Sequence, residues 1–245
     1  MFATCAIDCT LFLLYTKDIK IAIYLQINHE RNEKQMIKVA IIGFGGISKV
    51  HYNGYLALKA ENVPVELVAV CDVNPERFDI PIKTNLDVTP QPLAANIRTY
   101  TDVNELLAKE DFDMADICLP TYLHKEYAVQ MLNAGKHVLC EKPMALNAEE
   151  CDEMIDAANR NEKKLMIAQC VRFSSPYLYL KAAVTDGRFG KIRNLFMYRK
   201  SAQPRWGFEH WFEKTDKCGG AILDMHVHDI DMTRYYSASR KLSAA

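Results

Sequence analysis

The sequence has no long hydrophobic run, no excess of charge of one sign and no paired cysteine motif. The apolar stretch at residues 11–15, LFLLY, is too short to cross a bilayer, and no basic segment or small-residue cleavage site frames it as a signal peptide. Thirty basic residues stand against thirty-one acidic ones. This balance provides no general field for nucleic acid or an anionic membrane, so we expect neither as a partner.

The eight cysteines form no CxxC pair and no other zinc-ligand spacing. Cys71, Cys118, Cys140 and Cys170 each lie within or at the end of a short apolar run, where a reduced thiol behaves as a small hydrophobic side chain. The sequence therefore predicts a reducing, cytoplasmic setting and no structural metal.

Residues 1–35 differ in pattern from the remainder of the chain. The simplest interpretation is a leader outside the fold, with Met36 as a candidate natural start. The alternative is an added strand or helix that packs on the domain.

Short apolar runs alternate with segments of helical spacing from Met36 to Cys170. Runs of strand length, typical of strands buried on both faces, occupy residues 37–43, 65–72, 114–120, 136–143 and 164–170. Helical spacing falls at residues 49–60, 103–109, 123–134 and 148–159. This alternation predicts a doubly wound parallel sheet over residues 36–170, an α/β fold with right-handed crossovers.

The pattern changes after residue 170. A helix is expected at residues 176–185 and a strand at residues 192–199, followed by a Trp-containing loop. Residues 171–245 therefore resemble the start of a second, α+β domain, and residues 78–96 have no clear period and are expected to be irregular.

The loop GFGGIS ends the first strand and opens the first helix. In a loop of this kind Gly43 permits a tight turn, Gly45 lets the backbone approach a pyrophosphate, and Ser48 occupies the third small position. The amides at the helix start then face the phosphate charge. We expect the six residues of the loop to bind a dinucleotide: Gly43, Phe44, Gly45, Gly46, Ile47 and Ser48.

Asp72 ends the second apolar run, where a carboxylate can accept hydrogen bonds from the adenosine ribose hydroxyls. A 2′-phosphate would be repelled there, so NAD is favoured over NADP. The alternative is that Asp72 only caps the helix beginning at Pro75.

Two further loops leave the carboxyl ends of apolar runs, the edge at which parallel sheets bind ligands. The first carries Pro120, Thr121 and His124, and the second carries Glu141 and Lys142. A lysine beside a cofactor can polarise a substrate oxygen. There is a simpler alternative for each residue: His124 only starts a helix, and Lys142 is only a solvated charge.

The stretch LDMHVHDID, residues 223–231, contains two histidines and three aspartates. Its apolar residues do not alternate, and two glycines precede it, so we expect a helix on which Asp224, His228 and Asp231 share a face. As a strand it would point His226 and His228 the same way, as in an amidohydrolase metal pair.

These motifs occur together in one order: GFGGISKVH, CDVNPER, ICLPTYLHKEYAVQMLNAGKHVLCEKPMALN, VRF and GGAILDMHVHDID. Because these motifs follow one another in the order found in the Gfo/Idh/MocA family of nicotinamide-dependent oxidoreductases, the chain resembles that family over residues 36–236. The resemblance implies a Rossmann domain followed by a substrate domain that makes the subunit contacts of a homo-oligomer. Family chains continue well beyond the last motif, so residues 171–245 would form a partial substrate domain.

The resemblance also implies roles for individual residues. The family's catalytic lysine falls on Lys142, and its Asp-x-x-x-His pair falls on Asp224 and His228. We expect His228 to be the general base, Asp224 to bind substrate and orient His228, and Lys142 to stabilise negative charge on oxygen. Arg172 would contact substrate or pair with an acid, Trp206 would lie near the substrate, and His226 would be structural.

The function expected from these roles is hydride transfer between NAD(P) and a CH–OH group of a sugar, cyclitol or related polyol. Two alternatives stay open. The chain could be a non-catalytic dinucleotide-binding fragment, or it could resemble those family members that use NAD transiently in glycoside cleavage.

Overall fold

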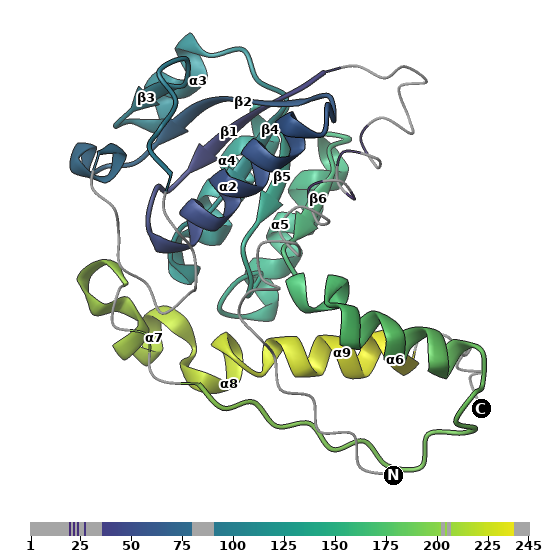
Figure 1. The fold of residues 1–245 in the computed structure, drawn as a ribbon. Helices are drawn as coiled ribbons and strands as arrows, with labels where there is room; N and C mark the ends of the chain where they lie inside the picture. The colour runs from purple at the N-terminus through teal and green to yellow at the C-terminus, as the bar shows by residue number, and fades with distance from the viewer. Residues whose placement is uncertain are drawn as a thin grey trace.

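A computed structural model describes residues 36–79, 91–201, 204 and 207–237, together with Lys20, Ala22, Tyr24 and Ile27. Its centre is a six-stranded parallel sheet in the order β3-β2-β1-β4-β5-β6 (Figure 1). The strands are β1 (Ile37–Ile42), β2 (Val65–Cys71), β3 (Arg98–Tyr100), β4 (Met114–Ile117), β5 (His137–Cys140) and β6 (Leu165–Ile167). This order is that of a Rossmann fold and confirms the doubly wound prediction. The short strand β3 was not predicted, because three partly exposed residues leave no apolar run.

Helices cover both faces of the sheet (Figure 1). They are α2 (Gly46–Ala60), α3 (Val103–Lys109), α4 (His124–Asn133) and α5 (Ala148–Arg160), with 3₁₀ turns η2 (Pro75–Phe78) and η3 (Thr121–Leu123). Local sequence sets where they begin. Asp102 and Asn147 each accept a hydrogen bond from a backbone N–H in the first turn of α3 and α5. All four helices coincide with the segments of helical spacing in the sequence.

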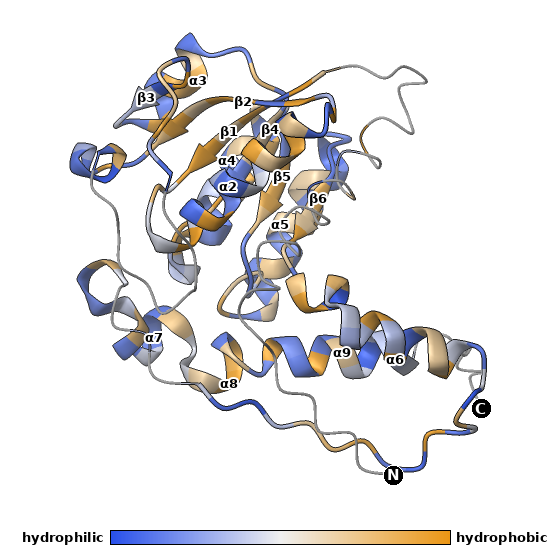
Figure 2. Ribbon diagram, viewed as in Figure 1, coloured by the Kyte–Doolittle hydropathy of each residue, from blue (hydrophilic) through white to orange (hydrophobic). Residues whose placement is uncertain are grey.

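The central strands β1, β2, β4 and β5 are mostly apolar, whereas the edge strand β3 and the outer sides of the helices are hydrophilic (Figure 2). Alternate residues of β1 enter different cores: Val39 and Ile41 pack with Tyr52 of α2, whereas Ala40 and Ile42 pack with Met131 of α4. Apart from Lys38, the residues of β1 are almost fully buried. A sheet buried on both faces has only its strand ends free for ligands.

The strand order reverses between β1 and β4. At such a switch point the loops that leave the carboxyl ends of the two strands diverge, and the crevice between them is where doubly wound sheets bind ligands. The glycine loop follows β1, the loop with Pro120 follows β4, and the loop with Lys142 follows β5. The fold therefore brings all three predicted loops to one edge.

Beyond the sheet, the described chain is helical or irregular. It forms η4 (Cys170–Phe173), α6 (Ser175–Thr185), η5 (Phe208–Glu213), α7 (Thr215–Cys218), α8 (Gly220–Asp224) and α9 (Val227–Ser237). The helix expected at residues 176–185 is present as α6, which packs beside α9 (Figure 1). The prediction of a strand at residues 192–199 is wrong. These residues find no ladder partner among the described residues, and an isolated strand cannot satisfy its backbone hydrogen bonds.

Three described residues of the N-terminal segment are buried. Lys20, Tyr24 and Ile27 have helical backbone, and Tyr24 and Ile27 join the core on the α2 side of the sheet. The prediction of a leader outside the fold is wrong for these residues, because Tyr24 and Ile27 pack in the core and Lys20 is buried. The other residues of that leader, apart from Ala22, lie outside the described part of the chain. Among the described residues, no helix has the length and apolar character needed to cross a membrane.

Candidate active site

The glycine loop turns sharply at Gly43, whose φ is +87°, and a Cβ there would lie 2.7 Å from the carbonyl oxygen of Cys118. Gly45 is different: a Cβ added to it would meet nothing within 4 Å. The space beside Gly45 lies at the start of α2, where backbone N–H groups and the helix dipole favour a phosphate. Ser48 is buried and donates a hydrogen bond to the carbonyl oxygen of Gly45 at 2.7 Å, which fixes the loop. The residues present therefore fit a dinucleotide pyrophosphate.

Asp72 is tied to the glycine loop. Its carboxylate accepts hydrogen bonds from the backbone N–H of Phe44 at 2.7 Å and from that of Asn74 at 2.9 Å. Asn74, and not Asp72, caps the 3₁₀ turn η2 by accepting a hydrogen bond from the N–H of Glu76. The alternative that Asp72 is only a helix cap is therefore wrong, because Asn74 provides the cap and Asp72 is bonded to the glycine loop.

Lys49 is a cation near Asp72 that the sequence analysis did not single out. Its Nζ lies 3.4 Å from the centroid of the Phe44 ring and donates to the carbonyl oxygen of Arg77 at 3.0 Å. Burial lowers the pKa of Lys49 to about 8, although the carboxylate of Asp72 opposes the shift. The helical spacing of α2 explains the position, since Lys49 follows Gly45 by four residues.

Two predicted residues of the loop after β4, Thr121 and His124, differ in their hydrogen bonding. Thr121 is buried, and its Oγ1 has no hydrogen-bond partner among the described residues. The two ring nitrogens of His124 lie 2.8 Å from the carbonyl oxygens of Pro143 and Leu119. The predicted cofactor contact of the His124 side chain is thereby corrected: this ring fastens the β4 loop to the β5 loop.

Glu141 also points inward. Its Oε1 lies 2.8 Å from Nε2 of His51, and its Oε2 accepts a hydrogen bond from the backbone N–H of Lys142 at 3.0 Å. These two contacts turn the Glu141 carboxylate toward His51 and the chain itself, and its contact with the cofactor stays a prediction. The carboxylate supports the backbone of Lys142.

Lys142 reaches across to the helical segment that follows the sheet. Its Nζ donates hydrogen bonds to the backbone carbonyl oxygen of Asp224 at 2.7 Å and to Oδ1 of Asp224 at 2.9 Å. Both side chains are largely buried, at 20% and 16% exposure. The structure therefore brings two of the three predicted catalytic residues into direct contact.

The segment 223–231 is helical, but it is not one helix. Asp224 ends α8, Met225 and His226 form a turn, and Val227 begins α9. The expected shared face of Asp224, His228 and Asp231 is therefore broken, because two residues of turn re-orient the chain. A strand-borne metal pair at His226 and His228 is likewise inconsistent with this backbone.

His228 is buried, and its Nδ1 has no hydrogen-bond partner among the described residues. Burial, reinforced by the positive charges of Lys142 and Arg199, lowers the pKa of His228 well below its ordinary value. The ring is therefore neutral and close to Lys142. Asp224 does not hydrogen-bond Nδ1, so the predicted orientation of His228 by Asp224 is corrected: Asp224 orients Lys142 instead.

The remaining predicted residues have structural contacts. The guanidinium of Arg172 pairs with Asp231 through two hydrogen bonds of 2.6 and 2.5 Å, which favours the acid-pairing alternative over substrate contact. His226 lies 3.2 Å from a carboxylate oxygen of Asp229, and its structural role stays a prediction. Trp206 lies outside the described residues.

Sequence reasoning missed a buried polar cluster beneath the site. His51 on α2 lies 2.9 Å from both carboxylate oxygens of Asp116 on β4, and Tyr55 donates to the same carboxylate at 2.8 Å. The signal was present in the sequence: His51 and Tyr55 are four residues apart on a helix, and Asp116 is an acid inside an apolar strand. The sequence does not show that the helix places His51 and Tyr55 beside Asp116.

Family comparison agrees with this geometry. Residues 37–169 match the model of the Gfo/Idh/MocA oxidoreductase family, described as an NAD-binding Rossmann fold. Residues 177–242 match the GFO/IDH/MocA C-terminal domain. The chain belongs to the Gfo/Idh/MocA family. It accordingly carries the NAD-binding domain of that family, as the resemblance implied.

Similar Gfo/Idh/MocA proteins include sugar and inositol dehydrogenases. Glucose-6-phosphate 3-dehydrogenase of Bacillus subtilis is 33% identical over 82% of this chain and 53% of its own length. Myo-inositol 2-dehydrogenase of Thermotoga maritima is 30% identical over 81% of this chain and 54% of its own length. The chain thus spans about half the length of these curated relatives.

Solved structures show the same fold. Myo-inositol 2-dehydrogenase of Lactobacillus plantarum has a TM-score of 0.64 at 28% identity, covering 82% of this chain and 56% of that one. The WlbA dehydrogenase of Chromobacterium violaceum, solved in complex with NADH and UDP-GlcNAcA, has a TM-score of 0.62 at 27% identity, covering 83% and 56%.

Proposed function

We propose that this Gfo/Idh/MocA protein catalyses NAD-linked oxidation of a CH–OH group in a sugar, cyclitol or related polyol. One observation carries the proposal. Nζ of Lys142 is hydrogen-bonded to Asp224 at the carboxyl edge of the sheet, and burial and the positive charge of this ammonium together lower the pKa of the His228 imidazole. A cation and a neutral base side by side are what alcohol oxidation needs. The names of the similar dehydrogenases support the same substrate class.

The dinucleotide would be held by the loop from Gly43 to Ser48 and by Asp72. The open space beside Gly45 would take the pyrophosphate, and the carboxylate of Asp72 would accept hydrogen bonds from ribose hydroxyls. When bound, the nicotinamide supplies the acceptor for the hydride that leaves the carbinol carbon.

Residues of the chain would handle the proton and the charge on oxygen. A ring nitrogen of neutral His228 would accept the hydroxyl proton, and its lowered pKa keeps it unprotonated at neutral pH. Nζ of Lys142 would donate a hydrogen bond to the substrate oxygen as negative charge develops there. Asp224 would hold that ammonium in place and contact the substrate.

The preference for NAD over NADP rests on Asp72, whose carboxylate would repel a 2′-phosphate. Lys49 is already engaged with the carbonyl oxygen of Arg77 and the ring of Phe44. The test is the ratio of catalytic efficiencies with the two cofactors, which we expect to favour NAD and to fall in Asp72→Ser. Assembly into a homo-oligomer, which the resemblance implied, stays a prediction.

The decisive experiment measures NADH binding by calorimetry and NAD reduction with a panel of polyols on the same samples. We expect Lys142→Ala and His228→Gln to lose turnover and keep NADH affinity, while the exposed Lys109→Ala behaves as wild type. Loss of NADH binding together with turnover would contradict these roles. Binding without turnover in wild type would favour a non-catalytic dinucleotide-binding fragment, and release of sugar from a glycoside without net NADH would favour glycoside cleavage.

A further inference from the structure

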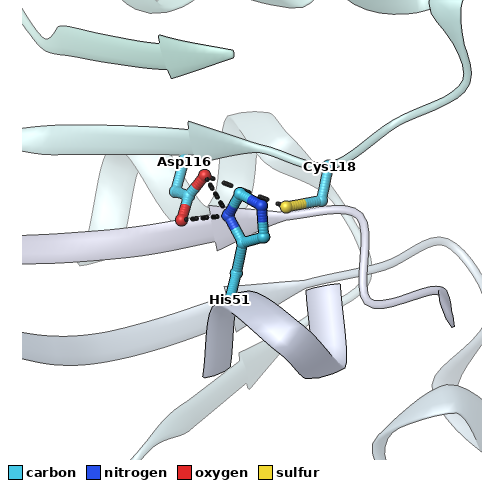
Figure 3. A group of neighbouring side chains, drawn as sticks. All are labelled: His51, Asp116 and Cys118. Atoms are coloured by element: carbon cyan, nitrogen blue, oxygen red, sulfur yellow. Dashed lines mark hydrogen bonds and ion pairs between the residues drawn. The ribbon is translucent and has the colours of Figure 1, made fainter. Parts of the chain in front are cut away.

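A cluster of ionisable side chains is buried between α2 and the sheet, beneath the loop that carries Lys142. Figure 3 shows three of its members, with the imidazole of His51 directed at Asp116 and beside the thiol of Cys118. Glu141, Tyr55 and the N-terminal Lys20 complete it. None of these six residues has a part in the chemistry described above.

The geometry assigns the charge of His51. Its Nδ1 lies 2.9 Å from both oxygens of Asp116, and its Nε2 lies 2.8 Å from Oε1 of Glu141. A carboxylate only accepts hydrogen bonds, so both ring nitrogens must donate, and a ring that donates twice is an imidazolium. Burial is the largest single effect and would lower the pKa of His51, as would the charge of Lys20. The charge and hydrogen bond of Asp116, together with Cys118, outweigh both and raise the pKa well above its ordinary value.

A metal ion is the rival interpretation, because ligand atoms of His51, Asp116 and Cys118 all lie within 4.8 Å of one another. Three observations oppose it. Metal-ligating histidine is neutral, whereas both nitrogens of His51 face carboxylates. Burial raises the pKa of the Cys118 thiol to about 12, away from the thiolate that a metal needs. The ammonium of Lys20 is also buried here, with its Nζ 4.7 Å from the centroid of the Tyr55 ring.

The cluster is connected to the candidate active site through Glu141. One carboxylate oxygen is bonded to His51, and the other accepts the backbone N–H of Lys142 at 3.0 Å. From the same residue, Nζ of Lys142 reaches Asp224. The polar contacts therefore run without a break from Asp116 through His51 and Glu141 to Lys142.

We propose that His51 is a positioning residue. Its imidazolium is held by Asp116 and fixes the carboxylate of Glu141. Glu141 in turn fixes the backbone N–H of Lys142, and so the position from which Lys142 reaches its substrate. The inference rests on the proposed function for its kinetic consequence, but its structural part concerns only Lys142. Misplacing a catalytic group by about 1 Å costs roughly 10²-fold in rate, so a positioning role predicts a large effect on kcat and little effect on NADH binding.

The test compares His51→Gln and Glu141→Gln with His137→Gln. His137 is a matched control, because it is a buried histidine at the opposite end of β5, with its Nδ1 accepting the backbone N–H of Lys164 at 3.0 Å. We expect the two cluster variants to lower kcat roughly 10-fold to 100-fold, with the KM for NAD and the affinity for NADH unchanged. His137→Gln should change none of these. An equal loss of NADH affinity and kcat in the cluster variants, or an unchanged kcat, would overturn the proposal.

Two measurements stand without turnover and separate this inference from the proposed function. Nitrogen NMR of the wild-type chain should show His51 protonated on both ring nitrogens at pH 7.5, and a neutral ring would overturn the assignment. Acylation of Lys142, followed by mass spectrometry and referenced to Lys109, should become several-fold faster in the cluster variants as the amine is released from Asp224. An unchanged rate would overturn the positioning role, whereas absence of turnover in wild type would count only against the proposed function.

Discussion

Lys142 and Asp224 are 82 residues apart in the sequence and joined by two hydrogen bonds, one to the backbone carbonyl oxygen and one to the carboxylate. The first bond needs only the end of α8 to lie beside the β5 loop, whereas the second needs the aspartate side chain. The contact therefore ties the sheet to the helical segment that follows it. In the proposed function, the same contact holds the Lys142 ammonium near the substrate oxygen on which charge develops.

Asp224→Asn should separate the charge of this pair from its geometry. The amide still accepts a hydrogen bond from Nζ, but the anion that attracts the ammonium is lost. We expect kcat to fall about 10²-fold, with NADH affinity unchanged. Turnover and calorimetry on Asp224→Asn, beside the exposed Asp216→Asn as control, measure this, and a wild-type kcat would argue against a catalytic role for Asp224.

The two glycines of the loop should respond differently to alanine. A Cβ at Gly43 meets the Cys118 carbonyl oxygen at 2.7 Å in a left-handed backbone, so Gly43→Ala should lower the free energy of unfolding by more than about 1 kcal/mol. Gly45→Ala meets no protein atom within 4 Å and should keep wild-type stability. It should nevertheless lose NADH affinity by at least about tenfold, because the methyl group occupies the pyrophosphate space. Tight NADH binding by Gly45→Ala would contradict this location.

Arg172→Ala distinguishes a structural from a substrate-binding arginine. The pair with Asp231 is 42% and 14% exposed, and solvent screening reduces its contribution to about 1 kcal/mol. We expect a fall of that size in unfolding free energy, measured by urea titration, and an unchanged KM for substrate. The control is Arg188→Ala, whose pair with Asp186 is about half exposed on both sides and should contribute nothing measurable. A raised KM without a stability loss would restore the substrate-contact interpretation.

His228 should make the fold sensitive to acid. Its folded-state pKa is depressed, so its contribution to stability is complete above the unfolded-state pKa of about 6.5 and is lost as the pH falls through the folded-state pKa. The contribution of His51 has the opposite sign and is already complete below that pH. Between pH 6.5 and 5, wild type should lose up to about 1.4 kcal/mol per pH unit more than His228→Gln. Urea midpoints would check this, and the exposed His210→Gln should retain the wild-type pH dependence.

The N-terminal segment contributes to the core through Ile27, which is 2% exposed. Ile27→Ala should cost roughly 2 to 4 kcal/mol of unfolding free energy, as buried large-to-small changes do. Ile155→Ala, at 45% exposure on α5, is the matched control and should cost little. Equal, small effects would mean that Ile27 does not pack in the core in solution.

The sequence alone was sufficient for the strands of the sheet other than β3 and for the glycine loop. Runs such as residues 37–43 and 65–72 are apolar because their strands are buried on both faces, and that pattern is local. The turn at Gly43 and the helix start at Gly46 also depend on residues a few positions apart. The family motifs likewise pointed to Lys142, Asp224 and His228, which the fold brings to one region, and their catalytic roles stay predictions.

Only the tertiary structure decided which partners the polar side chains take. Glu141 and His124 lie on loops at the ligand edge, yet their side chains turn inward. Glu141 bonds to His51, and His124 lies within hydrogen-bond distance of two backbone carbonyl groups. Likewise, Asp224 pairs with Lys142 and not with His228, since a turn at residues 225–226 separates α8 from α9. A hydrogen bond depends on orientation over a few ångströms between residues far apart in the chain, and periodicity reports only which face of its own element a residue occupies.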